Sequence, residues 1–156
     1  MKTHSLPRHA MLSRGFTLVE VMVVITILAT LAAIAMSSYT KQTRESRRTD
    51  AKTAILDLAA REERNFSTTN QYSANPAFLG YTGAFPITIG AGYYTLDVTA
   101  LTVGVAGGAP ASYTLTAQAV GDQAKDTSCF TYTYTQAGVQ QTVNTGGADT
   151  TATCWR

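Results

Sequence analysis

The sequence predicts an α+β protein in which one long N-terminal helix packs on a small antiparallel sheet of four strands. Residues 16–36 form an apolar run, and neither Pro nor Gly interrupts the sequence from there to residue 66. Farther on, three segments alternate apolar and polar side chains, which is typical of strands that bury one face. The 156 residues of the chain suffice for one such helix and one small domain.

The apolar run from Phe16 to Met36 contains 21 residues and a single charged side chain, Glu20. A helix of that length spans about 32 Å, which is enough to cross a bilayer core of about 30 Å. A secretory signal peptide has its small-residue cleavage site after the apolar segment, whereas here Gly15 precedes it. Cleavage at Gly15 would remove only residues 1–15 and keep the apolar helix.

An ordinary signal anchor with a chance glutamate is the alternative interpretation. An unpartnered carboxylate in a membrane helix costs about 2–3 kcal/mol, so Glu20 indicates a function.

Residues 1–15 are polar and basic and contain Pro7, so we interpret them as a leader that sets orientation in a membrane. The leader holds Lys2, Arg8 and Arg14, three of the 12 basic residues, so nine basic and ten acidic residues remain. This balance disfavours nucleic acid as the main partner.

Residues 37–66 continue the helix as an amphipathic half. The apolar side chains that recur there at helical spacing are Ala51, Ala54, Ile55, Leu58 and Ala59. The charged side chains that we expect on the other faces are Lys52, Asp57, Arg61 and Glu62.

Residues 41–64 carry seven basic and five acidic side chains. We interpret them as a solvated face with local ion pairs, such as Glu45 with Arg48 and Asp57 with Arg61. The alternative is contact with other subunits, or with lipid headgroups near Arg44, Arg47 and Arg48.

Residues 67–91, with Pro76 and Pro86, have no sustained period and predict a connecting loop. Residues 92–156 then supply the sheet and the tail. Strands are expected at 93–98, 113–119 and 130–135, followed by a short fourth strand at 139–143. The apolar stripe of the helix is the surface available to cover them.

The tail after residue 143 consists of small polar residues that bury too little apolar area to hold themselves in place. Cys129 and Cys154 are the only cysteines. In an exported protein such a pair indicates one disulfide, which would close a loop of about 25 residues and contribute about 3 kcal/mol. In the cytosol the same pair indicates thiols.

The motif RGFTLVE at residues 14–20, followed by about twenty apolar residues, resembles the prepilin signature of type IV pilins and their pseudopilin relatives. This resemblance implies that a prepilin peptidase cleaves between Gly15 and Phe16 and N-methylates Phe16. It also implies the type IV pilin fold, with a variable αβ-loop at 67–91 and a C-terminal region bounded by the disulfide. The segments LDLAAREERNF and YYTLDV and the ending CWR are most similar to PilE-type minor pilins.

The resemblance implies a structural subunit of a type IV pilus, a minor pilin involved in assembly or initiation of pili that serve cell adhesion and twitching motility. The expected partners are other pilin subunits in the filament core, the prepilin peptidase and the inner-membrane assembly platform. The subunit would cross the inner membrane once before assembly and then lie in the extracellular pilus, with its globular domain periplasmic or extracellular. Glu20 would pair with the Phe16 amine of the adjacent subunit.

Two other functions of pilin-like proteins are the alternatives for this chain. A type II secretion pseudopilin is one, but the main pseudopilins often replace the disulfide loop with a calcium site, so Cys129 and Cys154 argue against this class. A DNA-capturing competence pilin is another, and it requires a basic, aromatic surface. After Phe66 only Lys125 and Arg156 are basic, against four Asp, although Arg61 and Arg64 remain available.

An enzyme is the interpretation that the sequence supports least. His4 and His9 leave with the leader, and no free cysteine is expected. We therefore predict no catalytic residue, no metal site and no cofactor.

Overall fold

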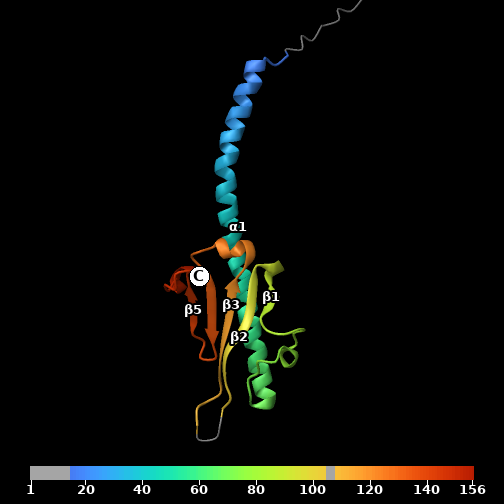
Figure 1. The fold of residues 1–156 in the computed structure, drawn as a ribbon, viewed down its shortest axis with the longest axis vertical. Coiled ribbons are helices and arrows are strands. Elements are labelled where there is room, and N and C mark those ends of the chain that lie inside the picture. Colours follow the sequence, from blue (N-terminus) through green and yellow to red (C-terminus); the bar gives the residue numbers. More distant parts are fainter. Residues whose placement is uncertain (1–14, 105–107) are drawn as a thin grey trace, which may run out of the picture. The chain divides into compact units, whose positions relative to one another are not determined.

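The computed structural model describes residues 15–104 and 108–156, apart from the side chain of Ser37. Most of the expected leader, residues 1–14, lies outside the described residues. The chain divides into two compact parts, Met1–Tyr39 and Thr40–Arg156, and the helix α1 (Leu18–Thr69) belongs to both (Figure 1). The remaining elements are η1 (Pro76–Leu79), β1 (Ile87–Ile89), η2 (Gly90–Gly92), β2 (Tyr94–Thr102), β3 (Ser112–Ala119), η3 (Gly121–Lys125), β4 (Thr131–Thr135), β5 (Gln140–Val143) and α2 (Thr151–Cys154).

Helix α1 begins two residues later and ends three residues later than the predicted range of 16–66. At its start, Thr17 Oγ1 accepts a hydrogen bond of 3.2 Å from the backbone N–H of Glu20, as an N-cap does. At its end, the hydroxyls of Ser67, Thr68 and Thr69 donate to the carbonyls of Arg64 and Asn65. The N–H of Asn70 donates to the Phe66 carbonyl at 2.7 Å, so the helical hydrogen bonds continue past residue 66 and the helix is longer than predicted.

The apolar segment of α1 is long and apolar enough to cross a membrane, and none of it is buried within the described part of the chain. Its large side chains are exposed along the whole segment: Leu18 near the start is 75% exposed, and Met36 at the end is 70% exposed. Soluble monomers rarely expose an apolar surface of this extent, so lipid or neighbouring subunits must cover it.

The sheet is an antiparallel meander of five strands in the order β1-β2-β3-β4-β5. The sequence predicted four. The additional strand, β1, lies in the segment 67–91 that was expected to be a loop and pairs with the start of β2, Ile89 opposite Tyr94. With three residues between Pro86 and Gly90, it is too short to produce a recognisable alternation.

The sheet face that meets α1 is apolar across its central strands. Leu96 of β2 lies opposite Ala117 of β3, which lies opposite Tyr132 of β4, and all three are fully buried. The helix residues in this core are Ala51, Ile55, Leu58 and Ala59, as predicted. Burying each Ile or Leu side chain contributes about 1.5–3 kcal/mol, so this stripe holds the second half of α1 on the sheet (Figure 1).

The tail from residue 144 onward is folded, and hydrogen bonds hold it in addition to the predicted disulfide. Asn144 Oδ1 accepts hydrogen bonds of 2.9 Å from the N–H groups of Gly146 and Ala148. Thr150 Oγ1 donates to the Ser128 carbonyl at 2.8 Å, and Trp155 Nε1 donates to the Gln141 carbonyl at 3.1 Å. Polar hydrogen bonds therefore replace the apolar burial that the composition lacks.

The structure joins Cys129 and Cys154 in a disulfide, as the sequence predicted. Cys129 lies just before β4 and Cys154 ends α2, and both are buried. The bond therefore anchors the tail to the sheet.

Replacing both cysteines by serine is expected to lower the free energy of unfolding by about 3 kcal/mol, because the bridge constrains a loop with a sequence separation of 25. Amide hydrogen exchange of the full chain in detergent should accelerate in residues 144–156, while residues 51–62 of α1 stay protected. Equal acceleration in both segments would contradict the local role of the disulfide.

Candidate functional site

The N-terminal end of the described chain carries the predicted processing site. Gly15 and Phe16 precede α1, and Phe16 is 82% exposed. Among the described residues, no atom other than those of the chain neighbours lies within 4 Å of the position that a Gly15 side chain would occupy. The peptide bond between the two residues is thus sterically open.

Glu20 lies in the first turn of α1 and is exposed. Its backbone N–H is capped by Thr17, but its carboxylate makes no hydrogen bond or ion pair within the described residues. An unpartnered carboxylate in an apolar segment is costly, and the described residues supply no partner for this one.

Farther along α1, Arg48 forms a largely buried ion pair with Asp126, which follows η3. The bond from Arg48 Nε to Asp126 Oδ2 is 2.6 Å, and that from Nη2 to Oδ1 is 2.8 Å. This hydrogen bonding raises the pKa of the Arg48 guanidinium above its ordinary value. The predicted pair of Arg48 with Glu45 was wrong, because a bidentate partner 78 residues away is better placed.

The other two arginines of this turn also pair with η3. Arg44 and Arg47 each lie 3.6 Å from Asp122, and the Arg47 guanidinium lies 3.6 Å from the centre of the Tyr93 ring. The buried Gln123 donates to the Arg44 carbonyl and to the Tyr94 hydroxyl, both at 3.0 Å. The three arginines therefore dock η3 on the helix, whereas the sequence predicted local ion pairs on a solvated face.

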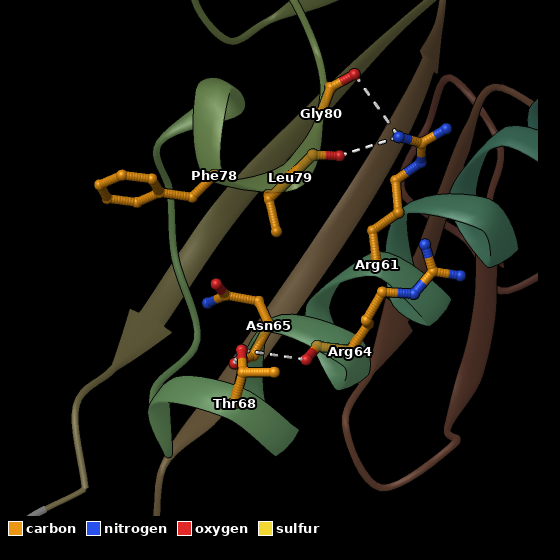
Figure 2. A pocket seen from close by; sticks show the side chains of 7 residues that line it. All are labelled: Arg61, Arg64, Asn65, Thr68, Phe78, Leu79 and Gly80. Atoms are coloured by element: carbon orange, nitrogen blue, oxygen red, sulfur yellow. Dashed lines mark hydrogen bonds between the residues drawn. The ribbon is translucent and has the colours of Figure 1, made fainter.

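At the other end of the domain, Arg61 holds the loop that follows α1 (Figure 2). It pairs with Asp57 at 2.7 Å, as predicted, and donates to the Leu79 carbonyl at 2.9 Å. Gly80 has φ +74°, a backbone conformation that residues with a side chain rarely adopt, so this turn favours glycine.

Arg61 also lines a cavity of about 330 Å³ shown in Figure 2. The Arg64 guanidinium, which also lines this cavity, makes no hydrogen bond or ion pair within the described part of the chain. Phe78, on η1, extends away from the helix and is 70% exposed. The cavity thus combines a free cation with an exposed aromatic ring.

Glu62 is fully buried, so its predicted place on an exposed face was wrong. One carboxylate oxygen accepts a 3.0 Å hydrogen bond from the Ser73 N–H, and the other has no partner in the described structure. Burial raises the pKa of Glu62 to about 6, with Glu63 beside it adding to the shift and the bond from Ser73 opposing it. Glu62 follows Ile55 and Leu58 at spacings of seven and four, which already placed it on the buried stripe.

Glu63 next to it accepts hydrogen bonds of 3.1 Å from the hydroxyls of Tyr72 and Tyr113. Together the two glutamates tie the αβ-loop and β3 to the end of α1. Nothing in the spacing of the sequence indicated these contacts. Among the described residues, no group of three or more His, Cys, Asp or Glu side chains could hold a metal ion.

Two family models match the chain. One, described as type IV minor pilin ComP, DNA uptake sequence receptor, matches residues 37–133, which is more than half of the chain. The other, described as the prokaryotic N-terminal methylation motif, matches residues 11–36, which include Gly15, Phe16 and Glu20. A comparison with curated proteins gave no match.

Glu62 should make the stability of the fold depend on pH. Its pKa is about 6 in the folded chain and near 4.5 in the unfolded chain, so the folded chain binds more protons between these values. Stability should therefore fall by about 2 kcal/mol as pH rises from about 4.5 through 6, and Glu62→Gln should remove this fall. Thermal unfolding of the full chain in detergent at pH 4.5–8 measures the difference.

Glu45→Gln is the matched control, because the Glu45 carboxylate makes no hydrogen bond or ion pair within the described residues. The control should keep the pH dependence of the unmodified chain. If Glu62→Gln kept it as well, the assigned role of Glu62 would be wrong.

Proposed function

The chain belongs to the type IV minor pilin ComP family, and we propose that it enters the pilus as a subunit whose first residue is Phe16. Proteins of this family are structural subunits that assemble with other pilins. The apolar segment and the methylation motif fit anchoring in a membrane before assembly. The open backbone at Gly15 and Phe16 is the observation that supports processing between these two residues.

In this proposal a prepilin peptidase removes residues 1–15 and N-methylates Phe16. The new amine has a pKa near 7.7–8.0, so it is mostly charged at neutral pH, and N-methylation keeps that charge. In the filament it pairs with Glu20 of the adjacent subunit, which supplies the partner that this carboxylate lacks within its own chain. The pairing fixes the axial register of neighbouring helices.

The proposed location follows from the same steps. Before assembly the subunit crosses the inner membrane once, with its globular domain in the periplasm. The assembly platform then moves it into the extracellular filament, where neighbouring apolar helices replace lipid around residues 16–36. Adhesion and twitching motility are the proposed roles of the pilus it joins.

A second candidate function is the binding of DNA, although the sequence disfavoured it. The matching family is described as a DNA uptake sequence receptor. The Arg64 and Phe78 cavity of Figure 2 favours this function, because an exposed ring stacks bases while a free guanidinium contacts phosphate. The balance of acidic and basic residues on the rest of the chain limits such binding to a local site.

Glu20→Ala should still be cleaved and inserted in the membrane but should enter pili poorly, because the amine of the adjacent subunit then lacks its partner. Mass analysis of the N-terminus tests cleavage, and quantitative immunoblotting of sheared pili tests incorporation. Incorporation at the level of the unmodified protein would refute the pairing. A leader still attached in assembled material would refute processing at Gly15.

Phe78→Ala should weaken DNA binding about tenfold, because stacking on one aromatic ring contributes about 1–3 kcal/mol. Arg64→Ala should also weaken binding, because the contact between its guanidinium and a phosphate is lost. Arg64→Ala should also lower the salt dependence by about one phosphate contact. Fluorescence anisotropy with labelled single-stranded and double-stranded DNA measures both, and Val103→Ala is the control for an exposed apolar side chain outside the cavity. Unchanged affinity in both variants would exclude this cavity as the DNA site.

A further inference from the structure

A second polar cavity, of about 360 Å³, lies at the other end of the domain. Helix residues 41–48 form one wall, and residues 125–128 with Thr153 form the other. The cavity lies entirely within the compact part that begins at Thr40. Its size is that of a small-molecule site.

Some of its charged groups are already used inside the domain. Arg48 and Asp126 form their bidentate pair, and Lys125 donates to Asp122 at 2.8 Å. These contacts form the frame of the cavity and leave little capacity for a ligand.

Other lining groups have hydrogen-bonding capacity left. Within the described residues, the Lys41 ammonium, the Glu45 carboxylate and the side-chain hydroxyls of Thr127, Ser128 and Thr153 make no hydrogen bond or ion pair. Arg44 Nε is buried and has no hydrogen-bond partner, although a buried donor normally has one. The cavity thus presents several unused donors and one unused carboxylate.

Unused donors beside one carboxylate suit a ligand that carries both a phosphate and a primary ammonium. A phosphate accepts hydrogen bonds from ammonium, guanidinium and hydroxyl donors, whereas a lone carboxylate would repel it. A primary ammonium attached to the phosphate would meet Glu45 and remove that repulsion. A ligand that carries both groups therefore fits the lining better than a simple anion does.

We infer that this cavity binds the phosphoethanolamine headgroup of a phospholipid in the membrane that anchors the unassembled subunit. The phosphate lies against Lys41, Arg44 and the hydroxyls, and the ammonium donates to Glu45. The inference rests on membrane anchoring before assembly, and it is independent of the pairing proposed for Glu20.

The position of the cavity along the chain favours a lipid over DNA. Lys41 is five residues beyond Met36, the last residue of the apolar segment, so even an extended chain places it within about 18 Å of that end. In a helix the distance is about 7.5 Å, which is comparable to the thickness of a headgroup layer. A phosphodiester backbone, which carries no primary ammonium, would leave the Glu45 carboxylate without a hydrogen-bond donor.

The test titrates the full-length protein, in micelles of an uncharged detergent, with water-soluble glycerophosphoethanolamine. Calorimetry should detect saturable binding. Glycerophosphocholine should bind about tenfold more weakly, because its trimethylammonium group has no N–H to donate to Glu45. Inorganic phosphate should also bind more weakly than glycerophosphoethanolamine.

The variants separate the two halves of the site. Glu45→Gln should abolish the preference for ethanolamine over choline, and Lys41→Met should weaken the binding of both headgroups. Arg64→Met removes the same charge outside the cavity and should change neither. Glu20→Ala should bind the headgroup normally, so a failure of the assembly proposal leaves this result unaffected.

Three outcomes would overturn the inference. Equal affinity for the ethanolamine and choline headgroups would show that Glu45 does not accept a hydrogen bond from the ammonium. Inorganic phosphate binding as tightly as glycerophosphoethanolamine would make the cavity a simple anion site. Displacement of the headgroup by double-stranded DNA, with loss of DNA binding in Lys41→Met, would assign the cavity to nucleic acid.

Discussion

The ion pair between Arg48 and Asp126 is the contact on which the arrangement of the domain depends. It joins α1 to the segment between β3 and β4, three residues before the disulfide at Cys129. Because the pair is bidentate, it fixes orientation as well as distance. Its burial makes it costly to break, since removing one partner of such a pair leaves an uncompensated charge that costs about 3–5 kcal/mol. The position of η3, and with it the wall of the headgroup cavity, follows from this contact.

The second half of α1 acts as the common support of the domain. Near its start, Arg44 and Arg47 dock η3, while near its end Arg61 and Glu62 dock the αβ-loop. Between them, the apolar stripe around Ile55 covers the sheet. Polar contacts at both ends therefore set the register of a helix that nonspecific apolar packing alone would allow to slide.

The docking contacts of α1 also explain which functional groups remain free. Arg48 and Arg61 spend their donors on docking loops, which removes them from consideration as binding residues. Arg44 also contacts η3, but its Nε keeps an unused donor. What remains is Glu20 in the apolar segment, the free ends of Lys41 and Glu45, and Arg64 beside Phe78. Each of these groups is suited to a different partner: a neighbouring subunit, a headgroup or a nucleic acid.

The sequence by itself determined the features that arise from neighbouring residues. Helical spacing of Ala51, Ile55 and Leu58 predicted the buried stripe, and alternation predicted β2, β3 and β4. The motif around Gly15 and Phe16 predicted the family. The disulfide joins residues 25 apart and is the exception, since the presence of only two cysteines predicted it. Such patterns are visible in the chain because the period of a helix or strand is a local property.

Only the tertiary structure decided which partner each polar side chain takes. Arg48 was expected to pair with Glu45 on its own helix, but it pairs with Asp126, and Glu62 is buried beside the αβ-loop. The tail is held by hydrogen bonds that the Asn144 side chain accepts and the Thr150 hydroxyl donates, and its composition did not predict these bonds. Hydrogen bonds and ion pairs act over about 3 Å whatever the separation along the chain, so their partners depend on how the fold brings distant segments together.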